Sequence, residues 1–383
     1  MRIAVVGYPV LAERQWLLCS EFERMGHDVH ILVPESWPNV PGDDEPSDSV
    51  PFSIHRHSSA LHGYDGVYFL QGLSESIERI DPDGVITHGE PWQFITGQTG
   101  WICNRLGVSH AVFSWENLDR VPSSRVKRGL ESLVYSRIDG IIAGSEATET
   151  RLRNRGFDGP ITTAPQTGVD TEKFSPDVDG TDVRSSFGIG ADSPLVLYAG
   201  RLVAEKGINV LVDAVPAVSK AVPEAEFLIL GTGPMEDELR SQIDKTVDTD
   251  RVTLVTERQP YSRMPKIYNS ADIFTYPSVT IDDWAEQFGY ATVEAMSCGV
   301  PVVTTECGAL PSVVGDGGLV CPEHDAGSLA DRLSDLLTDP EYRREIGNAA
   351  RERASTKFSL SGVAKTQVEF ISQLSSSRSG GVR

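Results

Sequence analysis

Short apolar runs alternate with amphipathic stretches along the first half of the chain. Runs typical of strands occupy residues 2–7, 28–33, 52–57, 84–88, 111–114 and 140–143. Segments whose apolar positions recur with a helical period occupy residues 11–25, 92–106, 123–137 and 146–154. Strands that alternate with helices in this way are typical of βαβ units, so the pattern predicts a parallel sheet covered by helices.

The alternation stops between residues 168 and 192, where Pro, Gly, Asp and Ser are frequent, and then resumes. Strands are predicted at residues 195–199, 227–230, 252–255, 273–276 and 300–304, and helices at 206–222, 235–244, 263–269, 289–297 and 326–337. Two helical segments follow at 341–355 and 360–374, and residues 375–383 are expected to be disordered. The predicted fold class is therefore α/β, with two doubly wound, Rossmann-like parallel-sheet domains (residues 1–175 and 194–357) facing across a cleft and a linker at 176–193.

The chain is long enough for two such domains, and it is strongly acidic. Its 383 residues include 55 Asp and Glu against 34 Lys and Arg, which gives a formal net charge of −21. A protein of this sign repels nucleic acid, so no nucleic-acid partner is expected. High Asp and Glu with scarce Lys resembles the composition of proteins from a salt-rich cytoplasm, and an ordinary acidic protein is the alternative.

Cysteine spacing and the first residues bear on where the protein works. The five Cys are scattered without a C-x-x-C pair, which indicates reduced thiols and argues against a disulfide framework or a zinc site. The opening MRIAVVGYPV lacks the basic start and cleavage site of a secretory leader, and no apolar run approaches the length of a membrane span. A cytoplasmic location is therefore expected.

The stretch from residue 282 to 303, DDWAEQFGYATVEAMSCGVPVV, holds the strongest candidate chemistry. Gly289 lets a backbone approach a ligand, and the N–H groups at the start of the following helix favour an anion such as a pyrophosphate. Glu286 precedes this helix and Glu294 lies inside it, so the two carboxylates would reach different parts of a ligand over the helix tip. Because carboxylates accept hydrogen bonds from sugar hydroxyls, the ligand that fits is a nucleotide-sugar.

Two basic residues follow the strand predicted at 195–199. Arg201 lies where this strand ends and Lys206 where the next helix begins. Both would lie at the ligand-binding edge of the sheet, where an Arg fork and a Lys point charge can neutralise two phosphates. The alternative is that both are solvated loop charges.

These motifs, taken in order, resemble the retaining glycosyltransferases of family 4, which have the GT-B fold. The resemblance rests on Gly200-Arg201-Leu202 with Lys206-Gly207, on Gly231-Thr232-Gly233-Pro234, and on Glu286 with Glu294. Residues 165–170, closed by Phe174, are similar to the interdomain segment of that family, and the resemblance covers nearly the whole chain. Residues 90–92 and 115–117 resemble a branch that includes cell-surface glycan enzymes. In such proteins the last helix returns to the first domain, which is expected here of residues 359–375.

The resemblance implies a role for each matching position. Arg201 and Lys206 would hold the diphosphate, Glu294 would bind the ribose, and Glu286 would contact the transferred sugar. The other donor-binding positions expected are Gly7, Gly200, Gly231, Phe288, Gly289 and Tyr290. No metal is expected, because prepositioned cations and helix N–H groups can stabilise the departing diphosphate.

His88 closes the strand predicted at 84–88, where many relatives place a His near the transferred sugar. Glu90 in the same loop is the other candidate for this catalytic position. The alternative interpretation of His88 is a hydrogen-bonded imidazole at a strand end.

Two positions depart from the family pattern. Ser312 stands where the family usually has Glu, and the loop after Gly7 lacks the common second glycine. The base and sugar of the donor therefore stay open.

Other histidines and one basic segment offer weaker signals. His55, His57 and His62 could suggest a metal, but a His-x-His on a strand without a carboxylate cluster is typical of a surface, so no metal site is expected. Residues 123–137 combine basic and apolar positions, as a helix on an anionic membrane does. Glu131 interrupts that pattern, and a core-facing helix with a charged outer face is the favoured interpretation.

The sequence thus predicts a metal-independent, retaining glycosyltransferase that needs no cofactor beyond its substrates. It would move a hexose from GDP-mannose or a UDP-hexose to a glycan or lipid-linked acceptor in surface polysaccharide or glycoprotein assembly, with peripheral membrane contact at most. One alternative is a sugar-nucleotide epimerase on the same fold, which would need carboxylates suited to proton transfer. The other is a non-catalytic sugar-nucleotide-binding partner.

Overall fold

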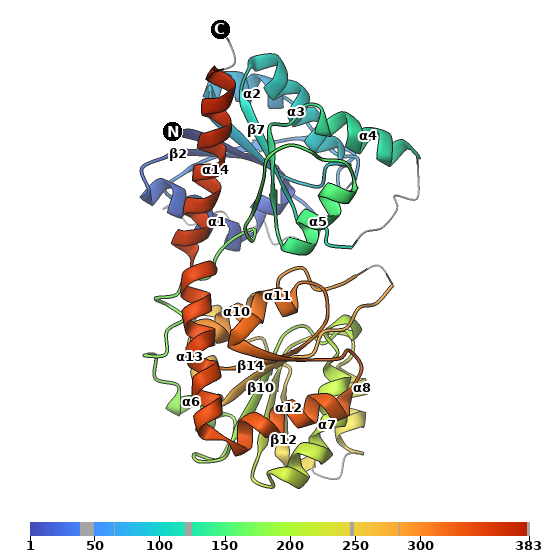
Figure 1. Cartoon of the computed structure of the whole chain (residues 1–383), viewed down its shortest axis with the longest axis vertical. Helices are drawn as coiled ribbons and strands as arrows, with labels where there is room; N and C mark the ends of the chain where they lie inside the picture. The colour runs from blue at the N-terminus through green and yellow to red at the C-terminus, as the bar shows by residue number, and fades with distance from the viewer. Residues whose placement is uncertain (39–49, 65, 119–124, 246–248, 283, 381–383) are drawn as a thin grey trace. The chain divides into compact units, whose positions relative to one another are not determined.

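The computed structural model describes residues 1–38, 50–64, 66–118, 125–245, 249–282 and 284–380 (Figure 1). Its contacts divide the chain into two units. Unit 1 holds Met1–Gly168 together with the segment from Leu360 onward, and unit 2 holds Val169–Ser359.

The boundary between the units lies earlier than the sequence predicted, at Gly168 rather than residue 175. Val169 forms a parallel bridge with Ser359, and Arg351 donates hydrogen bonds of 3.0 Å to the carbonyl oxygens of Thr171 and Phe174. These contacts tie residues 169–174 to unit 2. The predicted linker also contains a short helix, α6 (Thr181–Ser186).

Unit 1 is built on a parallel sheet that has, among the described residues, seven strands in the order β3-β2-β1-β6-β7-β8-β9. The strands are β1 (Arg2–Val6), β2 (Asp28–Pro34), β3 (Ser53–His57), β6 (Gly84–His88), β7 (Ser109–Ser114), β8 (Gly140–Ala143) and β9 (Ile161–Thr163). The helices are α1 (Glu13–Arg24), α2 (Leu73–Ile80), α3 (Phe94–Leu106), α4 (Arg125–Tyr135), α5 (Glu146–Asn154) and α14 (Leu360–Gly380), with a 3-10 turn at Tyr8–Leu11. A separate antiparallel pair joins β4 (Ser59–Ala60) to β5 (Phe69–Leu70).

The central strands of unit 1 are apolar on both faces because helices cover both sides of the sheet. On one side, α14 packs beside α1 and over β6 and β7 (Figure 1). Glycines at the strand starts let this helix come close: a Cβ on Gly84 would collide with Ile371, and one on Gly140 would lie 2.6 Å from the Phe370 ring. The position of α14 therefore depends on two residues that lack a side chain.

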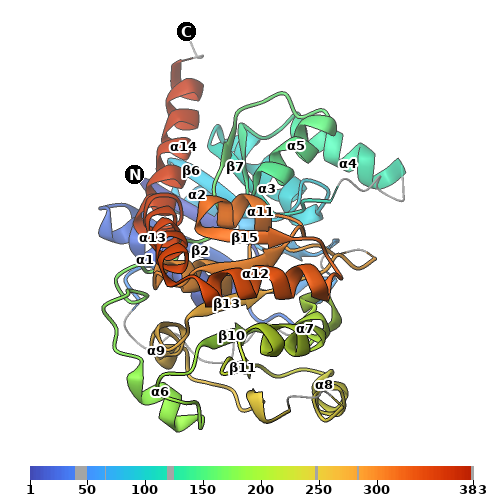
Figure 2. The ribbon, with the colours of Figure 1, turned by 60° about the horizontal axis from the view of Figure 1, so that its bottom comes forward.

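Unit 2 repeats the architecture with a parallel sheet that has, within the described ranges, six strands in the order β12-β11-β10-β13-β14-β15. The strands are β10 (Leu195–Ala199), β11 (Glu226–Leu230), β12 (Val252–Val255), β13 (Ile273–Tyr276), β14 (Val302–Thr305) and β15 (Gly318–Cys321). Its helices after α6 are α7 (Ile208–Ala221), α8 (Glu236–Ile243), α9 (Met264–Asn269), α10 (Tyr290–Ser297), α11 (Leu310–Val314), α12 (Ala326–Thr338) and α13 (Pro340–Lys357), with a 3-10 turn, η2, at Ala204–Lys206. Helices α7 and α12 lie side by side (Figure 2), and α10 packs against α13.

The strand order reverses once in each sheet, between β1 and β6 in unit 1 and between β10 and β13 in unit 2. In open α/β sheets, ligands bind outside the carboxyl ends of the strands at such a reversal. The predicted α/β class with two doubly wound parallel sheets is confirmed, and the loops after β1, β6, β10 and β13 lie at the two reversals.

The expectation of disorder at residues 375–383 was wrong for residues 375–380, which continue α14. Arg378 donates to the carboxylate of Asp139 at 2.7 Å and to the carbonyl oxygen of Val108 at 2.9 Å, and these bonds hold the end of the helix on unit 1. Residues 381–383 lie outside the described part of the chain, as do residues 123 and 124 of the segment predicted as a basic helix.

Within the described residues, no helix is both long and apolar enough to span a membrane.

Candidate active site

Two neighbouring loops of unit 2 bring Lys206 and Glu286 together at the strand reversal. The loop after β10 ends in the η2 turn, and Gly207 closes this turn in the left-handed conformation, with φ of 59°. A Cβ at Gly207 would collide with the carbonyl oxygen of Pro277, so the turn packs directly on the loop after β13. Val279 of that loop donates to the carbonyl oxygen of Glu205 at 3.0 Å. The chain therefore fixes one loop against the other through its backbone.

The Lys206 ammonium lies 2.5 Å from the Glu286 carboxylate, and both residues are buried. The Glu286 backbone is held from the loop after β14: its N–H donates to the Cys307 sulfur at 3.4 Å, and its carbonyl oxygen accepts from Ala309 at 2.8 Å. The Ser278 hydroxyl is 3.4 Å from the same carboxylate oxygen that Lys206 contacts. Three strand-end loops thus converge on one ion pair.

Helix α10 begins beside this pair. Gly289 precedes the helix with φ of 78°, and a Cβ there would lie 2.8 Å from the Leu310 side chain. Phe288 packs against Tyr290 on one side and Phe358 on another, with ring centres 4.8 and 5.3 Å apart. The positive φ of Gly289 and its close approach to Leu310 explain why glycine is needed where the chain enters α10.

Glu294 lies inside α10 and contacts two tyrosines that the sequence did not single out. Its carboxylate accepts hydrogen bonds from the hydroxyls of Tyr261 at 2.9 Å and Tyr268 at 3.0 Å. The residue is 3% exposed, and Lys173 lies 4.2 Å from the centre of the Tyr261 ring. Nothing in the sequence pattern marked these tyrosines, because they come from a different segment from Glu294.

Arg201 extends from the loop after β10, with 65% of its side chain exposed and a 3.2 Å contact to Glu205. The same loop lies tight against the loop after β11, because a Cβ on Gly231 would collide with the carbonyl oxygen of Gly200. The Tyr198 hydroxyl donates to the carbonyl oxygen of Arg201 at 2.8 Å. The backbone of this loop is therefore fixed while the Arg201 side chain is in solvent.

Ser312, at the departure from the family pattern, lies in the short helix α11. Its hydroxyl donates to the carbonyl oxygen of Ala309 at 2.9 Å, and its own carbonyl oxygen accepts from Arg353 at 2.7 Å. Ala309 is the residue that bonds the Glu286 backbone, so this serine belongs to the support of Glu286.

In unit 1, Gly7 and His88 meet at the reversal between β1 and β6. Gly7 has φ of 128°, and a Cβ there would lie 2.6 Å from the carbonyl oxygen of His88. The His88 ring is buried, stacks on Phe113, and has its Nδ1 3.0 Å from the Gln166 amide nitrogen. Burial lowers the pKa of His88 to about 3, so this imidazole is neutral near pH 7.

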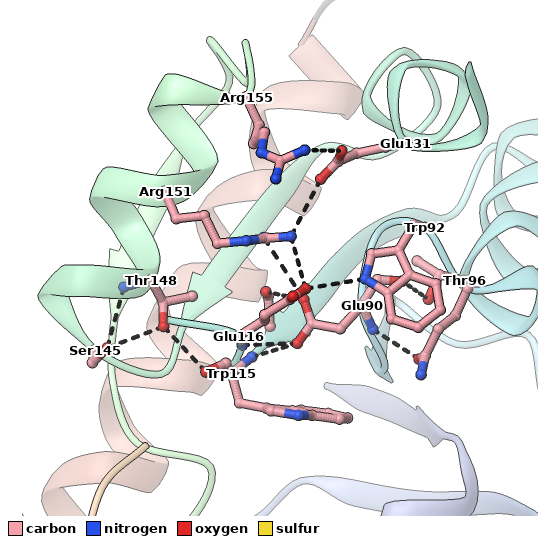
Figure 3. Close-up of polar contacts among 12 residues, drawn as sticks. Glu90, Trp92, Thr96, Trp115, Glu116, Glu131, Ser145, Thr148, Arg151 and Arg155 are labelled. Atoms are coloured by element: carbon pink, nitrogen blue, oxygen red, sulfur yellow. Dashed lines mark hydrogen bonds and ion pairs between the residues drawn. The ribbon is translucent and has the colours of Figure 1, made fainter. Parts of the chain in front are cut away.

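Glu90, in the loop after β6, is buried in a network of charges with residues of the loop after β7 and of α5 (Figure 3). Its carboxylate accepts from the Ser114 hydroxyl at 2.6 Å and from the backbone N–H groups of Trp115 and Glu116 at 2.9 and 3.0 Å. Burial raises the pKa of Glu90 to about 7, although Arg151 and the bonds from Ser114 and Trp115 lower it. Both oxygens of Glu90 are thus engaged by the protein itself.

Arg151 lies among three carboxylates in this network (Figure 3). Its guanidinium is 2.8 Å from Glu116, 3.6 Å from Glu131 and 4.0 Å from Glu90. Arg155 adds a second contact to Glu131, at 3.7 Å. The sequence did not identify Arg151. On a helix with many charged residues, such as α5, the sequence pattern does not distinguish a buried Arg side chain from an exposed one.

The remaining candidates of unit 1 make local contacts. His55 lies 3.0 Å from His30, His57 bonds the carbonyl oxygen of Gln71 at 2.8 Å, and His62 is 3.0 Å from the Ser59 hydroxyl. In α4, Val134 and Glu131 are buried, while Arg125, Lys127, Arg128 and Leu133 are exposed.

Of the predicted positions, the structure thus brings Lys206, Glu286 and the start of α10 together in unit 2, with Glu294 further along the same helix. Gly7 and His88 adjoin each other in unit 1, and Glu90 is directed into the charge network.

Comparisons with known proteins agree with this architecture in both units. A model of the glycosyl transferases group 1 matches residues 180–353, and a model of the glycosyl transferase 4-like domain matches residues 11–166. The D-inositol 3-phosphate glycosyltransferase of Corynebacterium aurimucosum is 28% identical over 326 residues, which are 79% of this chain and 75% of that protein. The GDP-mannose-dependent alpha-(1-6)-phosphatidylinositol monomannoside mannosyltransferase of Mycolicibacterium smegmatis is 34% identical over 194 residues, covering 49% of this chain and 50% of that one.

The fold is also found in solved structures. HepE of Anabaena, crystallised in complex with UDP, superposes with a TM-score of 0.77 over 97% of this chain and 100% of that chain, at 18% identity. Two matched family models, one for each unit, and relatives aligned over most of the chain lead to one assignment. The chain belongs to the group 1 glycosyltransferases of the family 4 type, with the GT-B fold.

Proposed function

We propose that this glycosyltransferase is a metal-independent, retaining hexosyltransferase that uses a nucleoside-diphosphate sugar as donor. The observation that carries the proposal is the buried pair of Lys206 and Glu286 at the carboxyl ends of β10 and β13, beside the start of α10. A cation, a carboxylate and a helix N-terminus at one place suit a ligand that joins a sugar to a diphosphate.

The chemistry asked of these groups is stabilisation of the leaving diphosphate. Lys206 and Arg201 would neutralise the charge that grows there as the bond to the sugar breaks, and the N–H groups at the start of α10 would add to this effect. Glu286 would contact hydroxyls of the transferred sugar. Because these groups supply the positive charge, the proposed reaction needs no metal.

Glu294 would bind the ribose of the donor. A carboxylate can accept roughly four hydrogen bonds, so ribose hydroxyls can join or replace those of Tyr261 and Tyr268. Glu294→Ala is expected to weaken donor binding mainly, whereas Lys206→Ala is expected to lower turnover as well. Wild-type kinetics in both variants would contradict these roles.

In unit 1, the contacts favour His88 over Glu90 as the group near the transferred sugar. Both Glu90 oxygens already accept hydrogen bonds from the chain. The neutral His88 ring contacts Gln166 through Nδ1, and its other nitrogen, Nε2, would be the one to bond the sugar. Glu90 would then position the loops after β6 and β7.

The donor proposed is GDP-mannose or a UDP-hexose, in line with the names of the mannosyltransferase relative and the HepE complex. The acceptor proposed is a glycan or a lipid-linked sugar of surface polysaccharide or glycoprotein assembly. A lipid-linked acceptor would bring the exposed basic residues of α4 to a membrane face. Sedimentation with anionic and with neutral vesicles tests this contact, and equal binding to both would contradict it.

A thermal-shift panel of UDP, GDP, ADP and their sugars, with and without EDTA, tests the donor site. We expect one nucleotide class to raise the melting temperature, EDTA to leave that rise unchanged, and Arg201→Ala to reduce it. Arg240→Ala is the matched control, because Arg240 is also exposed and also pairs with a Glu four residues away in the sequence.

Three results would count against the proposal. A folded protein that responds to no nucleotide would favour a non-catalytic role, and loss of the shift in EDTA would contradict metal independence. Retention is tested separately, by NMR of the anomeric configuration of the product, and an inverted product would overturn it.

A further inference from the structure

Lys206 is a buried cation with aromatic rings on two sides. Its ammonium lies 4.4 Å from the centre of the Trp284 ring and 5.1 Å from that of Tyr276, and the residue is 6% exposed. A cation within about 6 Å of an aromatic ring centre is attracted by the negative face of the ring, more strongly when water is excluded. Both distances fall inside this range.

The two rings come from the segment that also supplies Glu286. Tyr276 ends β13, and Trp284 lies in the loop between β13 and Glu286. The Trp284 backbone exchanges two hydrogen bonds with Ile281, of 2.6 and 3.0 Å. These bonds fix the backbone from which the Trp284 side chain extends.

We infer that Trp284 and Tyr276 are positioning residues for the Lys206 ammonium, and that Trp284 contributes in this way to affinity for the donor diphosphate. This inference rests on the proposed function, in which Lys206 binds that diphosphate. Neither residue was among the site residues predicted from the sequence, although Trp284 lies within the stretch 282–303.

The physical reason lies in how an ammonium divides its interactions. Lysine is a point charge on a flexible four-carbon stem, and its three N–H groups can point in several directions. The ion pair with Glu286 occupies an N–H group, whereas a ring face attracts the charge without a directed hydrogen bond. The rings thus help to hold the ammonium in place and leave N–H groups for phosphate oxygens.

A double-mutant cycle tests the inference. The dissociation constant of the nucleoside diphosphate selected by the thermal panel is measured by calorimetry for wild type, Trp284→Leu, Lys206→Met and the double variant. We expect Trp284→Leu to weaken binding roughly 2- to 30-fold when Lys206 is present. In the Lys206→Met background the same change should alter binding less than about twofold, because no cation faces the ring.

Two further variants separate the ring from simple packing. Trp284→Phe keeps an aromatic face and should bind within about threefold of wild type. Trp101→Leu is the matched control, because it removes an exposed indole that faces Arg105 in unit 1 at 5.4 Å, and it should leave binding unchanged. Equal loss in the Phe and Leu variants at position 284 would overturn the inference.

A second measurement covers the case in which Lys206→Met binds too weakly to titrate. The same four proteins are unfolded in urea without ligand, where the ring contact already exists. We expect the drop in urea midpoint caused by Trp284→Leu to shrink in the Lys206→Met background. An identical drop in both backgrounds would show that Trp284 acts by packing alone and would reject the inference.

The two levels of the proposal fail in different ways. If folded wild type binds no nucleoside diphosphate, the proposed function fails and the inference fails with it. If wild type binds and neither cycle shows coupling between positions 206 and 284, the inference alone fails.

Discussion

At the scale of single residues, the buried charged side chains of unit 1 form hydrogen bonds and ion pairs with loops of the same unit. Glu90 accepts hydrogen bonds from backbone N–H groups of the loop after β7, and Arg151 lies among Glu90, Glu116 and Glu131. A buried ion loses its hydration, and its partners offset this loss of free energy only while all of them are present. The network should therefore be sensitive to loss of one member.

Arg151→Met is expected to destabilise the protein by about 3–5 kcal/mol, because it leaves buried carboxylates without their central cation. Urea unfolding followed by circular dichroism measures this change. Arg332→Met is the control, since Arg332 is exposed and pairs with Asp335 on the surface of α12. The control should cost at most about 1 kcal/mol. Equal small losses in the two variants would show that Arg151 is not the centre of the network.

The pKa of Glu90 predicts how stability depends on pH. Burial raises this pKa from 4.5 in the unfolded chain to about 7 in the folded protein, so between these values only the folded state holds the proton. Stability from this group therefore falls as pH rises through that window and stays constant above it. The free energy of unfolding of wild type relative to Glu90→Gln should drop by about 3 kcal/mol between pH 4.5 and 7.5.

Urea titrations of both proteins across that range measure the difference. The buried His88 and His110 also have lowered pKa values, because of burial, but they titrate alike in the two proteins and cancel. A difference that does not change with pH would mean that Glu90 stays ionised in the fold.

At the scale of elements, the turn from η2 into α7 decides where Lys206 points. Gly207 provides the left-handed residue that ends η2, and the absence of a Cβ lets the turn lie on the carbonyl group of Pro277. Only glycine suits both features, because a side chain at position 207 would be strained in the left-handed conformation and would collide with the Pro277 carbonyl group. The element therefore links backbone geometry to the candidate site.

Gly207→Ala is expected to destabilise unit 2 and to weaken nucleotide binding together. Gly188→Ala separates strain from collision, because Gly188 has φ of 73° and has no heavy atom within 4 Å of an added Cβ among the described residues. The control should cost about 1–2 kcal/mol through conformation alone and leave binding intact. Urea unfolding and the thermal-shift panel measure both effects, and indistinguishable variants would contradict the role given to Gly207.

At the scale of the whole molecule, the net charge of −21 favours dependence on salt. Like charges spread over a folded surface repel one another and destabilise the compact state. In molar KCl the screening length falls to about 3 Å, so this repulsion is largely removed.

The melting temperature should therefore rise between 0.1 and about 2 M KCl, as expected of a protein adapted to a salt-rich cytoplasm. Differential scanning calorimetry measures this rise, and it also resolves the two units if they unfold separately. The same scans in sucrose control for general exclusion of solute from the surface. A melting temperature that is unchanged or lower in KCl would favour an ordinary acidic protein.

Most of the strands were predictable because parallel strands buried on both faces are short apolar runs, as in β6 and β10. Two edge strands, β9 and β15, were not predicted, because ITT has a single apolar residue and GLVC follows directly on the loop-like Gly315-Asp316-Gly317. Helix α14 extends past its predicted end because Arg378 finds partners on Asp139 and Val108, which a run of serines does not reveal. Such elements depend on contacts distant in sequence.

What the sequence determined by itself was the order of most strands and helices, the family, and the candidate residues Lys206, Glu286 and Glu294. Periodicity and glycine positions are local properties, so they can be read from the chain alone. Only the tertiary structure decided the partners of those residues: the rings beside Lys206, the tyrosines on Glu294 and the arginine among the carboxylates around Glu90. Partners of this kind come from different strand-end loops, and only the packing of the sheet brings those loops together.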